Sequence, residues 1–108
     1  MFGFSSNSKD VTVAEAEQQL GAADHCLLDV RTKEEFREVS APGALNIPLD
    51  QLQAGAPQLA KYSTIHVICR SGARSAMATR LLHDLGLPQA VNVAGGMLAW
   101  ESAGLPTK

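Results

Sequence analysis

An excess of positive charge is missing from this chain, and so are long apolar runs. Nine lysines and arginines stand against eleven aspartates and glutamates, which gives a net charge of −2. A general nucleic-acid binder needs a basic surface, so we expect no nucleic-acid partner. No stretch approaches the roughly 20 apolar residues that span a bilayer, so we expect no membrane partner. The first residues lack a basic segment followed by an apolar run, so no signal peptide is visible and we expect a cytoplasmic location.

Cysteine is scarce too, since the chain contains only Cys26 and Cys69. Cys26 opens one predicted strand and Cys69 closes another. If these strands are parallel neighbours, the two thiols lie at opposite edges of the sheet, roughly 10 Å or more apart, which is beyond disulfide reach. Cys69 is therefore expected to be a free thiol, which fits a reducing compartment.

The length leaves room for one domain, and the apolar share of 45% is ordinary for a globular protein. Residues 1–9 are small and polar and are predicted to be a flexible N-terminus. The single domain is predicted over residues 10–108.

Short apolar runs alternate with helical patterns along this domain. Two capping boxes, Thr12–Glu15 and Thr32–Glu35, predict the starts of two short helices. Strands are predicted over 26–30, 44–49, 64–69 and 90–93, and further helices over 75–85 and 98–102. Residues 50–62 have a weak helical pattern, which Gly55 and Pro57 interrupt. The strongest helix, 75–85, is predicted to bury one apolar face, made of Met77, Leu81, Leu82 and Leu85. The alternation predicts an α/β fold, a parallel sheet with helices on both faces.

Cys69 lies where ligands bind in such folds, at the carboxyl end of the best strand. The backbone N–H groups that follow it can form a concave nest, and the positive end of the next helix points the same way. Gly72 permits a backbone conformation that a β-carbon would forbid. This environment favours the thiolate, which is the nucleophile, and it also binds an anion. Arg70 and Arg74 are predicted to strengthen both effects.

The competing interpretation is that a cysteine at a strand end is a small core residue. We adopt it for Cys26, which has no glycine-rich loop and no basic neighbours. For Cys69 the spacing Cys-x-x-Gly-x-Arg-Ser, placed between a strand and a helix, favours the nucleophile.

Other chemistries fit the sequence poorly. His66 and Cys69 lie three apart on a strand, so their side chains face opposite sides, which disfavours a catalytic couple and a shared metal site. His25 and Cys26 are adjacent and make a poor chelate, so no metal is expected. Gly95-Gly96 lacks the spacing of a nucleotide-binding fingerprint. Four acidic residues are predicted to form a solvated surface: Asp24, Glu34, Glu35 and Glu38.

The chain resembles the single-domain rhodanese family from about residue 11 to residue 106, and four segments in register carry the resemblance. Each alone would be a weak signal. They are the Asp-Val-Arg-x-x-x-Glu-aromatic segment at 29–36, the Gly-Ala-x-Asn-Ile-Pro turn at 43–48, the six-residue active loop Cys69–Arg74, and the Gly-Gly-x-x-x-Trp helix start at 95–100.

The resemblance implies a three-layer α/β/α fold with a five-stranded parallel sheet, and it implies sulfur transfer. The Cys69 thiolate would take a sulfane sulfur from a small anionic donor, thiosulfate or a persulfide, and the resulting persulfide would give it to a thiol or cyanide. No separate cofactor is implied. Asp29 and Arg31 would support the loop from the neighbouring strand end. The donor would be bound by the residues that follow the nucleophile: Arg70, Ser71, Gly72, Ala73, Arg74 and Ser75.

One segment departs from the family pattern. The family usually carries Gly-His-Ile before the Pro-Gly turn, whereas Val39-Ser40-Ala41 stand here. Valine does not readily adopt the positive φ that a glycine allows, so the geometry of this turn is expected to change. The nucleophile and its loop are unaffected.

Three other functions compete with a small-molecule sulfurtransferase. A persulfide carrier or regulatory module would use the same cysteine and pass the sulfur to a protein acceptor. A phosphatase of the same fold would need a loop one residue longer, Cys-x5-Arg, whereas Arg74 follows Cys69 by five positions, Cys-x4-Arg. A purely structural module typically loses the loop cysteine. The enzyme is therefore favoured, and the protein-serving carrier is the main alternative.

Overall fold

The computed structural model describes residues 10–108, and the predicted flexible N-terminus at 1–9 lies outside the described residues. Four parallel strands form the sheet, in the order β2-β1-β3-β4. They are β1 His25–Asp29, β2 Leu45–Asn46, β3 Thr64–Ile68 and β4 Ala90–Asn92. The two central strands, β1 and β3, pair along their whole lengths, from His25 opposite Thr64 to Asp29 opposite Ile68. The predicted α/β fold with a parallel sheet is confirmed.

The prediction of a fifth strand is wrong for the described part of the chain. At the free edge of β4, Val11 forms a single isolated parallel bridge to Val93. The Val11 N–H donates to the Asn92 carbonyl at 2.9 Å, and the Ala94 N–H donates to the Val11 carbonyl at 2.8 Å. Thr12 then caps a helix, so the chain leaves the sheet after one paired residue.

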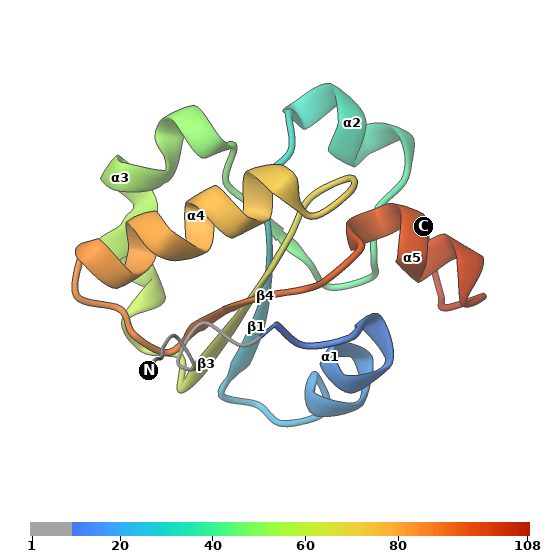
Figure 1. Ribbon diagram of the computed structural model, residues 1–108, viewed down its shortest axis with the longest axis horizontal. Coiled ribbons are helices and arrows are strands. Elements are labelled where there is room, and N and C mark those ends of the chain that lie inside the picture. The colour runs from blue at the N-terminus through green and yellow to red at the C-terminus, as the bar shows by residue number, and fades with distance from the viewer. Residues whose placement is uncertain (1–9) are drawn as a thin grey trace, which may run out of the picture.

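Helices cover both faces of the sheet (Figure 1). The helices are α1 Val13–Gln19, α2 Lys33–Glu38, α3 Leu52–Gly55, α4 Ala73–Asp84 and α5 Gly96–Ser102, with 3₁₀ turns η2 Leu49–Gln51 and η3 Ala56–Leu59. One buried apolar cluster joins the sheet to α3 and α4, and a second joins it to α1 and α5. No helix within residues 10–108 has the length and apolarity needed to cross a membrane.

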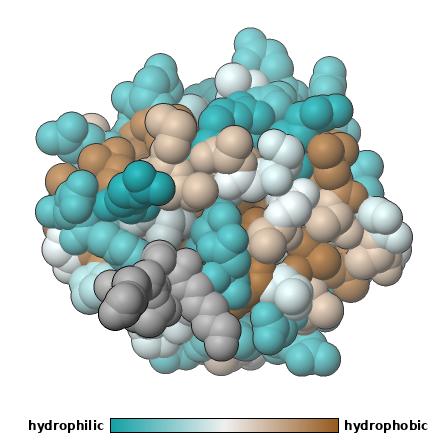
Figure 2. Space-filling view, in the orientation of Figure 1, coloured by the Kyte–Doolittle hydropathy of each residue, from teal (hydrophilic) through white to brown (hydrophobic). Residues whose placement is uncertain are grey.

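The apolar face predicted for α4 is wrong in two of its four residues. Met77 is 60% exposed and Leu85 is 38% exposed. The residues that α4 buries are mostly small or polar: Ser75, Ala78, Thr79 and Leu82. These positions follow helical spacing, and small side chains let the helix lie close to the sheet. On the face drawn in Figure 2, hydrophobic residues lie between hydrophilic ones at the surface.

Candidate active site

Strand β3 brings Cys69 to the carboxyl edge of the sheet, and the side chain is buried, with 1% of its surface exposed. A short loop follows, and α4 begins at Ala73 with Gly72 as its N-cap. Gly72 has φ +107°, and a β-carbon on it would approach the Gly95 nitrogen to 3.3 Å. A glycine is therefore required for this turn on both conformational and steric grounds.

Three hydrogen bonds converge on the Cys69 sulfur. The Gly72 N–H donates to Sγ at 3.1 Å and the Ser75 N–H donates at 3.3 Å. The Ser75 hydroxyl lies 3.2 Å from the same atom. Ser75 is fully buried, so its hydroxyl is held in this position without competition from solvent.

These contacts change the acidity of the thiol. Burial has the largest single effect and raises the pKa of Cys69. The hydrogen bonds from the Ser75 hydroxyl and from the N–H groups of Ser75, Gly72 and Ser71 together outweigh it, and the pKa falls below the ordinary value for cysteine. Hydrogen bonds to the charged form favour it, so the site stabilises the thiolate.

The first residues of α5 orient the loop by hydrogen-bonding its carbonyl groups. The Met97 N–H donates to the Cys69 carbonyl at 2.8 Å, and the Leu98 N–H donates to the Arg70 carbonyl at 3.0 Å. A β-carbon on Gly96 would come within 2.5 Å of both carbonyl oxygens. Because these two carbonyls point toward α5, the N–H groups of the loop are free to face the sulfur. Gly96 was not assigned to the site from the sequence. The signal that could have identified it is the pair Gly95-Gly96 shortly after a strand.

Asp29 and Arg31 form a buried ion pair at the end of β1. The guanidinium donates to the carboxylate at 2.8–3.1 Å, and it also donates to the Val39 carbonyl at 2.7 Å. Within residues 10–108 neither side chain hydrogen-bonds the Cys69 loop. The link to the loop is through the backbone, where the Val30 N–H donates to the Ile68 carbonyl at 3.0 Å.

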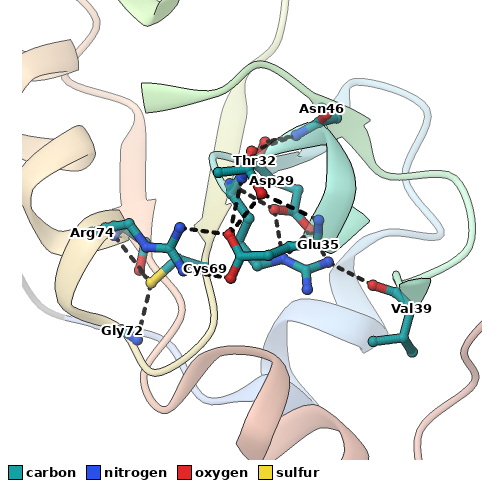
Figure 3. A network of polar contacts seen from close by, with 10 residues as sticks. Asp29, Thr32, Glu35, Val39, Asn46, Cys69, Gly72 and Arg74 are labelled. Carbon is teal, nitrogen blue, oxygen red and sulfur yellow. Dashed lines mark hydrogen bonds and ion pairs between the residues drawn. The ribbon is translucent and has the colours of Figure 1, made fainter. Parts of the chain in front are cut away.

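Arg74 is paired with a residue that the sequence reasoning placed elsewhere. Its two terminal nitrogens donate to the two carboxylate oxygens of Glu35 at 2.7 and 2.9 Å, and Figure 3 shows the two groups pointing toward one another. Glu35 is partly exposed, as predicted for a surface residue, but the prediction did not foresee this ion pair. Arg70, by contrast, is exposed and makes no ion pair with any described residue. Ser71 and Ala73 are also exposed at the mouth of the loop.

No residue of the segment Val39-Ser40-Ala41 has a positive φ. Val39 ends α2 with φ −158° and ψ 137°, which valine tolerates without strain. Ser40 is buried and exchanges two backbone hydrogen bonds with Lys108, at 3.1 and 2.9 Å. The turn is thus held by the last described residue of the chain.

The spacing of histidine and cysteine in the sequence predicts no metal site. Within residues 10–108 no group of three or more His, Cys, Asp or Glu side chains is arranged to hold a metal ion. The two cysteines are both free thiols. Cys26 pairs in register with Ile65, four residues before Cys69, so the thiols are about 13 Å apart along the sheet.

The family model for the rhodanese-like domain matches residues 12–103. The chain belongs to the rhodanese-like family. Its sequence is 38% identical over 114 residues to thiosulfate sulfurtransferase 16 of Arabidopsis thaliana, covering 94% of this chain and 92% of the relative. It is 39% identical over 74 residues to the putative sulfur carrier protein YrkF of Bacillus subtilis, covering 68% of this chain and 40% of the relative.

A solved structure of a rhodanese-related protein has the same fold as this rhodanese-like chain. The rhodanese-related protein of Thermoplasma volcanium superposes with a TM-score of 0.83 and 31% identity, covering 93% of this chain and 97% of that one. The curated relatives differ in length, however. The chain spans only about a fifth of several adenylyltransferase and sulfurtransferase proteins that it matches.

Proposed function

We propose that this rhodanese-like chain is a sulfurtransferase that carries a sulfane sulfur on Cys69. The observation that carries the proposal is the set of three donors on the Cys69 sulfur at the start of α4. Lowering the pKa of a buried thiol raises the share of thiolate, and the thiolate is the nucleophile. The names of the Arabidopsis and Bacillus relatives, a sulfurtransferase and a sulfur carrier, support the same class of chemistry.

The reaction has two displacements. The Cys69 thiolate attacks the outer sulfur of thiosulfate, the bond between the two sulfurs of the donor breaks, and sulfite leaves with the electron pair. This forms a persulfide anion on Cys69. A thiolate or cyanide then attacks the outer sulfur of that persulfide, and the Cys69 thiolate leaves. No cofactor beyond the cysteine itself takes part.

The loop offers the donor two kinds of contact. Its backbone N–H groups and the positive end of α4 would stabilise negative charge on the outer sulfur. Arg70 is exposed at the mouth and unpaired within residues 10–108, so its guanidinium is available to the oxygens of an anionic donor. Both cysteines are free, so we place the reaction in a reducing compartment such as the cytoplasm.

A persulfide carrier that serves a protein acceptor is the second candidate. It is favoured by the similarity to a putative sulfur carrier, of which this chain matches 40%. The same-fold phosphatase is disfavoured, because the arginine that would bind a phosphate, Arg74, already donates both terminal nitrogens to Glu35. Uniformly poor turnover of thiosulfate, glutathione persulfide and small thiols, with a persulfide present on Cys69, would favour the carrier.

The test of the proposal compares two cysteine variants. Cys69→Ser should abolish both thiosulfate:cyanide turnover and the gain of one sulfur seen by mass spectrometry after incubation with thiosulfate. Cys26→Ala should retain both, because Cys26 lies in the core at the opposite end of the sheet. Full activity in Cys69→Ser would overturn the proposal.

A further inference from the structure

The ion pair between Arg74 and Glu35 joins the active loop to a helix 39 residues earlier in the chain. Arg74 Nη1 lies 2.7 Å from Glu35 Oε1, and Nη2 lies 2.9 Å from Oε2. Such a bidentate contact fixes the plane of the guanidinium as well as its distance from the carboxylate. Arg74 is therefore held toward α2 and away from the open mouth of the loop.

Glu35 is itself held in place by the start of α2. Its Oε1 accepts hydrogen bonds from the Thr32 N–H at 3.1 Å and from the Thr32 hydroxyl at 3.2 Å. The Glu35 N–H donates back to the Thr32 hydroxyl at 3.2 Å. The capping box thus positions the carboxylate, and the carboxylate positions Arg74.

The ion pair between Arg74 and Glu35 also determines how much net positive charge lies near Cys69. The hydrogen bond from Arg74 has the largest effect in lowering the pKa of Glu35 to about 2, so the carboxylate is ionised wherever the thiolate can form. Arg74 directly precedes Ser75, whose N–H donates to the Cys69 sulfur at 3.3 Å, so its charge lies near the thiolate. Glu35 offsets part of that positive charge, which leaves Arg70 as the loop arginine without an ion pair among the described residues.

We propose that Glu35 is a positioning residue that pins Arg74 and offsets its charge. The affinity of the site for an anionic donor is then set by Arg70 and the loop N–H groups. Glu35 thereby limits both the acidity of Cys69 and the attraction of the site for donors with more than one negative charge. The part that concerns donors rests on the proposed function, whereas the part that concerns Cys69 ionisation does not.

Glu35→Gln separates the charge from the geometry. Glutamine at the third position of a helix supports a capping box as glutamate does, and its oxygen still accepts one hydrogen bond from Arg74. The chain offers a matched control in Glu15, which occupies the same position of the capping box of α1 and makes the two reciprocal capping-box contacts with Thr12. Glu15→Gln changes net charge and cap identically, far from the loop arginines.

The first measurement needs no substrate. Thiolate absorbance near 240 nm is followed against pH, with the matching Cys69→Ser protein as the blank. Burial raises the pKa of Cys26 to about 11, so below pH 9 its ionisation does not interfere. Glu35→Gln should move the Cys69 midpoint to lower pH, and Glu15→Gln should leave it at the wild-type value. An unmoved or raised midpoint in Glu35→Gln would overturn the proposal.

The second measurement uses donors of different charge at low salt. Glu35→Gln should lower the KM for thiosulfate about two- to fivefold, as expected for one uncompensated charge at a partly exposed site. The KM for methanethiosulfonate, which carries one negative charge fewer, should fall less, and both effects should fade at high salt. Equal KM values in wild type and Glu35→Gln would overturn the donor part. Lack of persulfide formation by the wild-type protein with either donor would instead refute the proposed function.

Discussion

The two cysteines of this chain show how strongly the surroundings of a thiol decide its chemistry. Cys26 is buried in the core, and burial raises its pKa to about 11, although the charge of Lys61 acts weakly in the opposite direction. Cys69 is buried as deeply, yet hydrogen bonds from the Ser75 hydroxyl and from N–H groups of the loop and of α4 bring its pKa below the ordinary value. The difference comes from the loop and the helix that follow Cys69, since both residues lie at strand ends.

Ser75→Ala removes the hydroxyl donor from Cys69 and leaves the backbone donors in place. A hydrogen bond to a charged group contributes about 1.5–3 kcal/mol, so the rate of persulfide formation from thiosulfate at pH 7 should fall by about tenfold to a hundredfold. The pH profile of that rate should move to higher pH, with partial recovery of the rate near pH 9, because the pKa of Cys69 rises.

Thr79→Val is the control for losing a buried hydroxyl from α4. The Thr79 hydroxyl donates to the Ser75 carbonyl at 2.7 Å and does not contact the sulfur. This variant should lose some stability and keep the wild-type pH profile. If Ser75→Ala and Thr79→Val had the same profile, the hydroxyl of Ser75 would have no part in thiolate stabilisation.

At the scale of elements, α5 holds the active loop through hydrogen bonds from its backbone. The N–H groups of its first turn donate hydrogen bonds to the Cys69 and Arg70 carbonyls. Gly96 lets the backbone of α5 lie close to these carbonyls. Gly96→Ala puts a methyl group 2.5 Å from both oxygens at φ +58°. We expect a loss of about 3 kcal/mol in the free energy of unfolding, measured in urea, together with loss of persulfide formation.

Gly104→Ala separates backbone strain from the clash. Gly104 has φ +73°, and nothing lies within 4 Å of its position for a β-carbon. This variant should lose only about 1 kcal/mol, the cost of placing an alanine in the left-handed region, and should keep its activity. Equal losses in the two variants would mean that contact between α5 and the loop is not the reason for the glycine.

Local signals predicted the elements well and their long-range partners poorly. Both capping boxes begin helices where expected, because a cap is made by residues three apart. Cys69 lies at a strand end before a helix for the same kind of local reason. The contact of Glu35 with Arg74 joins residues 39 apart, and no local pattern encodes it. The strand predicted over 44–49 is reduced to Leu45–Asn46, and the apolar face of α4 was misjudged because small residues pack there.

At the scale of the whole molecule, the sheet carries a buried histidine between its two helical layers. His66 is fully buried in β3, and its Nε2 lies 3.1 Å from Nδ1 of His25, with the two rings stacked. Its Nδ1 has no partner among the described residues. Protonation would therefore place a charged, unpartnered N–H in the core, which is costly.

Burial, reinforced by the charge of His25, lowers the pKa of His66 to about 4, whereas the unfolded chain has its histidines near 6.5. Between about pH 6.5 and pH 4, His66 is therefore protonated in the unfolded state and neutral in the folded state. The folded state keeps its full stability above about pH 6.5 and loses it as the pH falls toward 4. Between pH 7.5 and pH 5 the free energy of unfolding should fall by about 2 kcal/mol, measured by urea denaturation.

This pH interval excludes the contribution of the Glu35 carboxylate, whose pKa of about 2 affects stability only below about pH 4.5. His66→Phe should remove most of the slope, and His83→Gln, at a half-buried surface position, should retain it. A wild-type protein that is equally stable at both pH values would refute the assignment of the slope to His66.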